Sequence, residues 1–206
     1  MSFRIILASQ SPRRRALLRE AGLDFDIIVS DEEEKMVSSE PEELSGRLAL
    51  SKAMNAFNKA SIFYKGEDLA VIGSDTVVAL DGKILGKPSG PENAFEMIGM
   101  LQGRTHKVFT GAAIIRSGPS GIEKRCFTSC TSVSVYGMSD EEIEAYIYGK
   151  YPFPEGAVEW QGKAGAYGIQ DTFGLHYIKE ISGDYYTVVG LPVSRLMHEL
   201  KDMEII

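Results

Sequence analysis

The chain has 206 residues, of which 44% are hydrophobic and 25% are charged, a composition typical of a globular protein with a buried core. Its net charge of −7 argues against a general binder of nucleic acid polymers or of anionic membranes, so any basic site must be local. No apolar run approaches membrane-spanning length, and the chain enters a strand without a signal-peptide hydrophobic region. We therefore expect a cytoplasmic protein.

Cys126 and Cys130 are expected to be structural, since on a strand they lie roughly 13 Å apart and lack the spacing of metal ligands.

The first predicted elements are a strand and a helix with an unusual charge. The apolar run IILA predicts a buried strand, and Ser11 as N-cap with Pro12 at the first helical position predicts a helix start. Arg13, Arg14 and Arg15 then fall in the first turn, where the helix dipole is already positive. Two interpretations remain open: a solvated basic turn, or a site for an anion, most plausibly phosphate.

A strand is expected over residues 25–29, followed by a run of acids that includes Glu34. This run is either a solvated turn or a source of carboxylate oxygens for a divalent cation. Ser39 and Glu42 then form a capping box that predicts the start of a long helix. Lys52 falls on the apolar stripe of this helix, where it either extends to the solvent edge or points into a cleft and meets an anion.

The most strongly predicted strand covers residues 69–80, LAVIGSDTVVAL. Asp81 and Gly82 predict a two-residue hairpin turn after it, and Lys87 follows the hairpin. Asp75 interrupts the apolar pattern of the strand. A carboxylate there is costly unless it is paired or bound to a metal, and the competing interpretation is a capping or turn role.

The rest of the chain is predicted to contain the following elements: a helix over 91–101, strands over 106–115 and 125–136, a helix opened by Ser139, a long loop over 151–174, a closing strand pair over 175–181 and 185–189, and a last helix opened by Pro192. His106 is expected to be a hydrogen-bonded structural residue and not a base. The loop contains KAGAYGIQ, whose small residues let a backbone approach a flat ligand and whose Gln170 offers a donor and an acceptor to a base edge. A plain flexible loop is the competing interpretation.

Two sets of charged residues together suggest metal-assisted phosphoryl chemistry, in which cations neutralise the phosphates and carboxylates carry the metal and activate water. The sequence has no P-loop, no G-x-G-x-x-G fingerprint and no G-x-S-x-G elbow. The two sets are the basic residues Arg13, Arg14, Lys52 and Lys87 and the acidic residues Glu34 and Asp75.

Six segments, LASQSPRRRALL, GSDTVV, LGKP, HKVFTG, KAGAYGIQ and DYYTVVGLP, resemble those of the Maf-like nucleotide pyrophosphatases in the expected order over nearly the whole chain. The resemblance implies one domain over residues 1–206, an α/β fold with a mixed twisted sheet flanked by helices, and two lobes around a cleft. That fold would be related to the inosine triphosphate pyrophosphatases. The resemblance further implies hydrolysis of a nucleoside triphosphate to the monophosphate and pyrophosphate with Mg²⁺ or Mn²⁺, and it suggests a homodimer.

The resemblance also implies roles for particular residues. Asp75 would accept a proton and contact the metal, with Glu34 as the second acid. The triphosphate would be lined by Ser9, Arg13, Arg14, Lys52 and Lys87, and the two lysines would spread the charge of the leaving pyrophosphate. The pyrimidine branch of the family, which prefers dTTP and UTP, is similar to this chain at Arg13, Thr76 and Gln170.

Two rival functions remain. A phosphatase with Asp75 as a covalent nucleophile would need a D-x-D-x-T pattern, but Val77 stands two places after Asp75. A non-catalytic, nucleotide-sensing regulator of cell division would use the same charged residues. In either enzyme or sensor, we expect the arginines of the first helix and Asp75 to face each other across one cleft.

Overall fold

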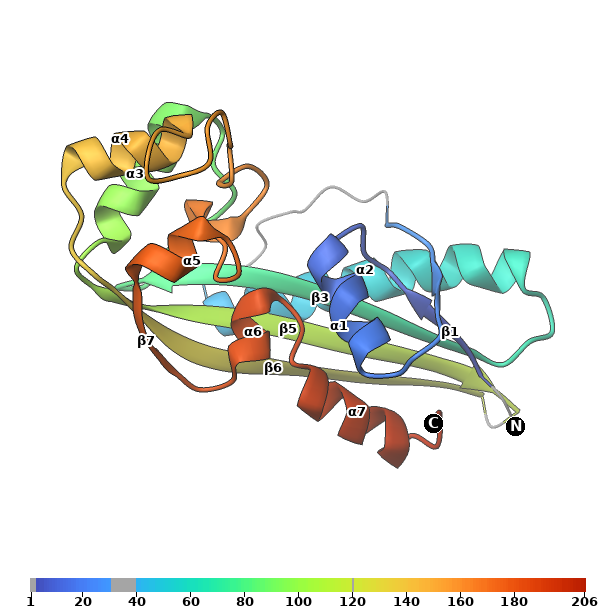
Figure 1. Ribbon diagram of the computed structural model, residues 1–206. Helices are drawn as coiled ribbons and strands as arrows, with labels where there is room; N and C mark the ends of the chain where they lie inside the picture. The colour runs from blue at the N-terminus through green and yellow to red at the C-terminus, as the bar shows by residue number, and fades with distance from the viewer. Residues whose placement is uncertain (1–2, 31–39, 120) are drawn as a thin grey trace. The chain divides into compact units, whose positions relative to one another are not determined.

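The computed structural model describes residues 3–30, 40–119 and 121–206. In this part of the chain seven strands form one mixed sheet in the order β2-β1-β3-β5-β6-β7, with β4 paired to β3, which confirms the predicted α/β class. The elements follow one another in this order (Figure 1): β1 (Arg4–Leu7), α1 (Pro12–Glu20), β2 (Asp26–Ile27), α2 (Pro41–Phe63), β3 (Leu69–Leu80), β4 (Lys83–Leu85), α3 (Pro91–Leu101), β5 (Thr105–Gly118), β6 (Gly121–Val135), α4 (Asp140–Tyr148), η1 (Ala164–Ala166), α5 (Thr172–Tyr177), β7 (Ile178–Ser182), α6 (Tyr185–Val189) and α7 (Val193–Asp202). None of these helices combines the length and the apolar character that crossing a bilayer requires.

The chain divides into two compact units, each with its own core. The first unit comprises residues 1–76, 110–129 and 190–206, and the second comprises 77–109 and 130–189. Strands β3, β5 and β6 each contribute residues to both units.

The first unit is built around parallel pairing of β1 with both of its neighbours. Ile6 pairs with Asp26 of β2 and with Val71 of β3, so β2 and β3 flank β1 on opposite sides. The crossovers from β1 to β2 and from β2 to β3 run through α1 and α2. Because such crossovers are right-handed and these two run in opposite directions along the sheet, α1 and α2 lie on opposite faces.

Helix α2 packs unusually closely on the sheet at two glycines. A Cβ built on Gly73 of β3 would lie 2.3 Å from the carbonyl oxygen of Ala49, and one built on Gly111 of β5 would lie 2.2 Å from that of Ser45. Alanines of α2, among them Ala49 and Ala53, pack with Ile6 of β1 in one buried cluster. Small residues on both sides therefore fix the height and register of α2 over the sheet.

The second unit has an aromatic core beneath its longest irregular segment. The Phe173 ring centroid lies 5.0 Å from that of Tyr146 and 5.2 Å from that of Tyr167. The Tyr146 hydroxyl donates to the carbonyl of Ala166 at 2.8 Å, and the Trp160 indole N–H donates to the carbonyl of Ile147 at 2.9 Å. The predicted loop over 151–174 is thus mostly irregular, but it is anchored to the unit's own core.

Two sequence predictions are corrected by the structure. The strand expected over 25–29 is reduced to Asp26–Ile27. The expected closing strand pair is wrong, because residues 172–177 form α5 and only Ile178–Ser182 pairs as β7. Residues 185–189 form α6, since the Asp184 carboxylate accepts hydrogen bonds from the backbone N–H groups of Tyr186 and Thr187 and so caps a helix.

His106 is a structural residue of the second unit, as expected. It is 2% exposed, and its Nε2 lies 2.7 Å from the hydroxyl of Tyr167, while Nδ1 is buried without a partner. Burial lowers the pKa of His106 from 6.5 to about 4, so the imidazole is neutral near pH 7.

We expect Gly111→Ala to lower the free energy of unfolding by about 1–3 kcal/mol, because the added methyl group overlaps the Ser45 carbonyl. Denaturant unfolding followed by circular dichroism measures this change. Gly99→Ala in α3 is the matched control: nothing lies within 4 Å of its added Cβ, and alanine favours a helix interior by about 0.5–1 kcal/mol over glycine. Equal stability of Gly111→Ala and the wild type would show that α2 does not pack this closely.

We expect acid to destabilise the protein through His106. The unfolded chain binds a proton at this residue below pH 6.5, whereas the folded protein binds it only below about pH 4. The stability from the neutral buried ring is therefore complete above pH 6.5, decreases as the pH falls, and is lost by about pH 4, in total about 3 kcal/mol.

Unfolding free energies measured between pH 7 and pH 4.5 test this expectation. The His106→Gln variant should lose less stability over that range than the wild type. Parallel profiles of the two proteins, together with an imidazole NMR signal of His106 that titrates near pH 6.5, would contradict it.

Candidate functional site

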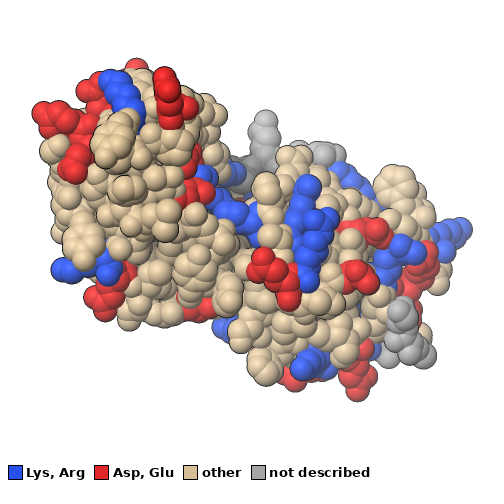
Figure 2. Space-filling model, viewed as in Figure 1, with Lys and Arg blue, Asp and Glu red and all other residues tan. Residues whose placement is uncertain are grey.

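The turn between β1 and α1 is held by its own serines. Ser9 is 6% exposed, and its Oγ accepts a hydrogen bond from the Ser11 N–H at 3.2 Å. Ser11 caps α1, its Oγ accepting from the Arg14 N–H at 3.4 Å, and Pro12 occupies the first turn, as predicted. The first turn of α1 contains no acidic residue, so the partial positive charge of the helix start is not offset locally. Figure 2 shows Lys and Arg side chains gathered where α1 lies in Figure 1, on a surface of otherwise mixed charge.

This turn lies beside the middle of β3. The ladder of β1 with β3 ends at Leu7 and Ile72, and the Ala8 N–H donates to the Ile72 carbonyl at 2.8 Å. Strand β3 continues beyond this point, so Asp75 and Thr76 lie past the carboxyl end of β1. In doubly wound sheets, ligands bind at the carboxyl ends of strands where the strand order reverses, and β1 is such a point here.

Asp75 lies on the α2 side of β3 and is paired with Lys52. The acid is 6% exposed, and Lys52 Nζ binds its Oδ1. Lys52 is positioned by the contact of Gly73 with Ala49 and Ala53, the residues that flank it on α2. Lys52, which the sequence places on the apolar stripe of α2, therefore pairs with an anion, and this anion is the buried carboxylate of Asp75.

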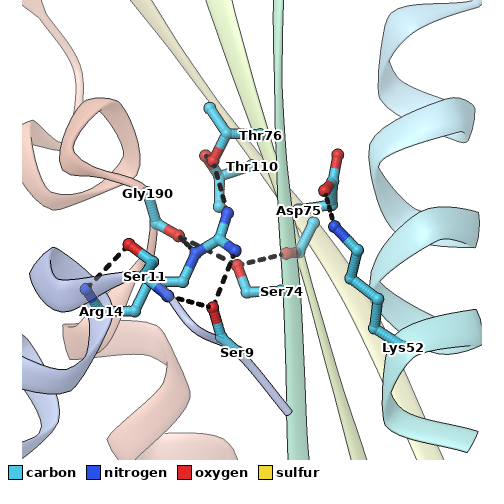
Figure 3. Close-up of polar contacts among 10 residues, drawn as sticks. Ser9, Ser11, Arg14, Lys52, Ser74, Asp75, Thr76, Thr110 and Gly190 are labelled. Carbon is cyan, nitrogen blue, oxygen red and sulfur yellow. Dashed lines mark hydrogen bonds and ion pairs between the residues drawn. The ribbon is translucent and has the colours of Figure 1, made fainter. Parts of the chain in front are cut away.

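The opposite side of β3 carries a second polar network, centred on Arg14. Its Nε donates to the Gly190 carbonyl at 2.7 Å, one terminal nitrogen donates to Ser9 Oγ at 3.3 Å, and the other donates to Thr76 Oγ1 at 3.2 Å. Thr76 Oγ1 also lies 3.0 Å from Thr110 Oγ1. Figure 3 shows Arg14 and Lys52 approaching β3 from opposite sides. Arg14 and Asp75 therefore do not face each other, although the residues they contact, Asp75 and Thr76, are neighbours on one strand.

Ser74 joins this second network to two other segments. Its hydroxyl is shared between the carbonyls of Gly111 at 2.9 Å and Gly190 at 3.0 Å. The roles of Ser74, Thr110 and Gly190 were not found from the sequence. For Gly190 a signal existed, because a glycine directly after the run YYTVV marks a change of backbone conformation, and here its φ is +121°.

The remaining predicted site residues are placed as follows. Arg13 is half-buried in the first turn of α1. Lys87, two residues after the end of β4, and Gln170 are exposed residues of the second unit. Glu34 lies outside the described residues, as does Ser39. The predicted capping box is wrong, because the N-cap of α2 is Glu40, whose side chain makes no capping hydrogen bond.

The segment that carries Gln170 is held by contacts within the second unit. Lys163 forms an ion pair with Asp171, and the Gly165 N–H donates to the Gly86 carbonyl at 3.0 Å. Gly165 has a φ of +68°, and a Cβ there would lie 3.0 Å from Val78. These contacts favour an ordered segment over the alternative of a plain flexible loop.

A divalent cation at this site would be held by carboxylate oxygens. Among the residues that the structure describes, no three His, Cys, Asp or Glu side chains gather in one group. A single buried carboxylate, Asp75, nevertheless fits Mg²⁺, which is commonly held by one or two carboxylates together with the phosphates of a substrate.

A separate cavity of about 410 Å³ lies at the amino end of β1. Its Arg4 is held by Asp26 and Glu67, each at 2.7 Å. Its lining among the described residues is Phe3, Arg4, Ile5, Asp24, Phe25, Asp26 and Glu67, and this set includes none of the predicted site residues that the structure describes.

Comparison with known proteins gives a consistent family match. A family model described as Maf-like protein matches residues 4–203. The dTTP/UTP pyrophosphatase of Bacillus thuringiensis subsp. konkukian is 43% identical over 203 residues, covering 98% of this chain and 96% of that protein. A dTTP/UTP pyrophosphatase of Bacillus cereus strain ATCC 14579 is 42% identical over 204 residues, with the same two coverages.

Among solved structures, a nucleoside-triphosphatase (dITP/XTP pyrophosphatase) of Mycobacterium abscessus matches with 15% identity and a TM-score of 0.35. The match covers 65% of this chain and 74% of that one. The family assignment rests on the sequence relatives.

Proposed function

The chain belongs to the Maf family, and from this membership we propose that it hydrolyses dTTP, UTP and related modified pyrimidine nucleotides to the monophosphate and pyrophosphate. The observation that carries the proposal is the 43% identity, over 98% of the chain, to proteins named dTTP/UTP pyrophosphatases. The site geometry is consistent with it, because the buried acid Asp75, paired with Lys52, lies on β3 just past the carboxyl end of β1, and the arginine-rich start of α1 lies on the other side of the same strand.

In this proposal Asp75 is the general base. Its Oδ1 is bound by Lys52, and its other oxygen takes a proton from a water that attacks the α-phosphorus. The bond from the α-phosphorus to the bridging oxygen breaks, and pyrophosphate leaves with the electron pair of that bond. The proton then passes from Asp75 to solvent.

The cationic residues bind the substrate and stabilise the leaving group. A bound triphosphate competes with Asp75 for Lys52, so the lysine that compensates the buried acid can also neutralise the departing charge. Ser9, Arg13 and Lys87 complete the triphosphate site in the proposal, with Glu34 as a second acid. Thr76 and Gln170 are proposed to favour pyrimidine bases. We do not include Arg14, since three protein oxygens already bind its guanidinium.

A divalent cation is part of the proposal. Asp75, with Glu34, would hold Mg²⁺ or Mn²⁺ together with the phosphates. When bound, the cation neutralises phosphate charge and polarises the reacting phosphorus.

The position of attack is tested with UTP in ¹⁸O-labelled water, with phosphorus NMR of the products. We expect UMP and pyrophosphate, with the label in UMP, because water attacks the α-phosphorus. UDP with phosphate, or label in pyrophosphate, would contradict the proposal. UTP binding without any release of pyrophosphate in the presence of Mg²⁺ or Mn²⁺ would instead favour a nucleotide sensor. A panel with CTP, ATP and GTP tests the pyrimidine preference.

We expect Asp75→Asn to lower kcat for UTP by about 10²–10⁴-fold, since the amide cannot accept the proton. Asp81→Asn is the matched control, because Asp81 is an exposed acid at the hairpin, paired with Arg104. It should keep nearly the wild-type kcat. Near-normal turnover by folded Asp75→Asn, with folding checked by circular dichroism, would remove Asp75 as the base.

A further inference from the structure

Arg14 is bound through every nitrogen of its guanidinium. Nε donates to the Gly190 carbonyl, and the two terminal nitrogens donate to the hydroxyl oxygens of Ser9 and Thr76 (Figure 3). The Gly190 carbonyl accepts a second hydrogen bond from the buried hydroxyl of Ser74. A planar guanidinium is suited to such a role because its donors diverge in a fixed geometry.

The contact with Ser9 determines what that hydroxyl can do. A serine oxygen has two acceptor lone pairs and one hydrogen. In Ser9 the Arg14 nitrogen and the Ser11 N–H supply two hydrogen bonds to the oxygen, at 3.3 and 3.2 Å. Both acceptor positions are therefore used, and the O–H of Ser9 is left as a donor.

The surroundings of Ser9 favour an anionic acceptor for this O–H. Ser9 lies in the turn after β1, separated from the strand by Ala8 and two residues before the N-cap of α1, at the positive end of the helix dipole. Ser9 is 6% exposed, so few acceptors can reach its hydroxyl.

We propose that Arg14 is a positioning residue that makes the Ser9 hydroxyl an obligate donor to the triphosphate, and that Arg14 does not itself bind phosphate. The sequence placed Arg14 among the phosphate ligands. The inference rests on the proposed function for the identity of the anion, but the hydrogen bonds that carry it are present in the protein alone. Through Thr76, the same guanidinium also fixes the residue next to Asp75 on β3.

A charge-conserving variant distinguishes positioning from direct binding. Lysine keeps the positive charge and remains a good phosphate ligand, but its single nitrogen cannot replace three donors that contact three separate segments. We expect Arg14→Lys and Arg14→Gln both to lower kcat/KM for UTP at least about ten-fold and to similar extents. Arg19→Gln, which removes the same charge from the other end of α1, should stay within about two-fold of the wild type. Near-wild-type kcat/KM in Arg14→Lys with a large loss in Arg14→Gln would show a direct phosphate contact and overturn the inference.

A double-mutant cycle with Ser9→Ala tests whether Arg14 acts through Ser9. If it does, most of the loss caused by Arg14→Gln disappears in the Ser9→Ala background, leaving less than about three-fold. Equal losses in both backgrounds would overturn the inference.

Hydrogen exchange of the backbone amides supplies a readout that needs no substrate. Arg14→Lys and Arg14→Gln should both speed exchange of the Ser11 amide, which donates to Ser9 Oγ, whereas Arg19→Gln should not. Unchanged exchange at Ser11 would overturn the inference. If the wild type releases no pyrophosphate from any triphosphate, the proposed function fails, and the exchange data alone then decide the role of Arg14.

Discussion

A carboxylate buried in a strand requires a compensating charge, and the pair of Asp75 with Lys52 meets this requirement. The pair can form only if α2 lies very close to β3, which the contact of Gly73 with the Ala49 carbonyl allows. An added methyl group at Gly73 would lift the helix and separate the charges. The packing of the first unit and the chemistry proposed for it therefore depend on the same small residues.

The alternation of side chains along β3 divides the polar residues into two groups. Asp75 points toward α2, whereas Ser74 and Thr76 point toward the side that carries Arg14. One strand thus supplies an acid to one face and hydroxyl groups to the other, with a single backbone step between them. Because β1 ends at Leu7, both groups lie at the position where a doubly wound sheet binds its ligand.

The long elements of the fold were predictable from local patterns, because the apolar run of β3 and the Ser11 cap of α1 depend on adjacent residues. The short elements near residue 185 were not, since the β-branched and aromatic run YYTVV favours a strand and the Asp184 cap overrides this preference. In the site, Asp75 was found because a charge interrupts an apolar run. The bond of Arg14 to Gly190 was not, because a hydrogen bond between residues 176 positions apart leaves no local pattern.

The bond from Arg14 to Gly190 has a consequence for biosynthesis. Arg14 is synthesised early, and Gly190 only after most of the polypeptide has been made. The turn before α1 therefore lacks this hydrogen bond until late in translation. Contacts of such large sequence separation close slowly. Assembly of this network therefore belongs to the last stages of maturation, when the core of the second unit can already have formed.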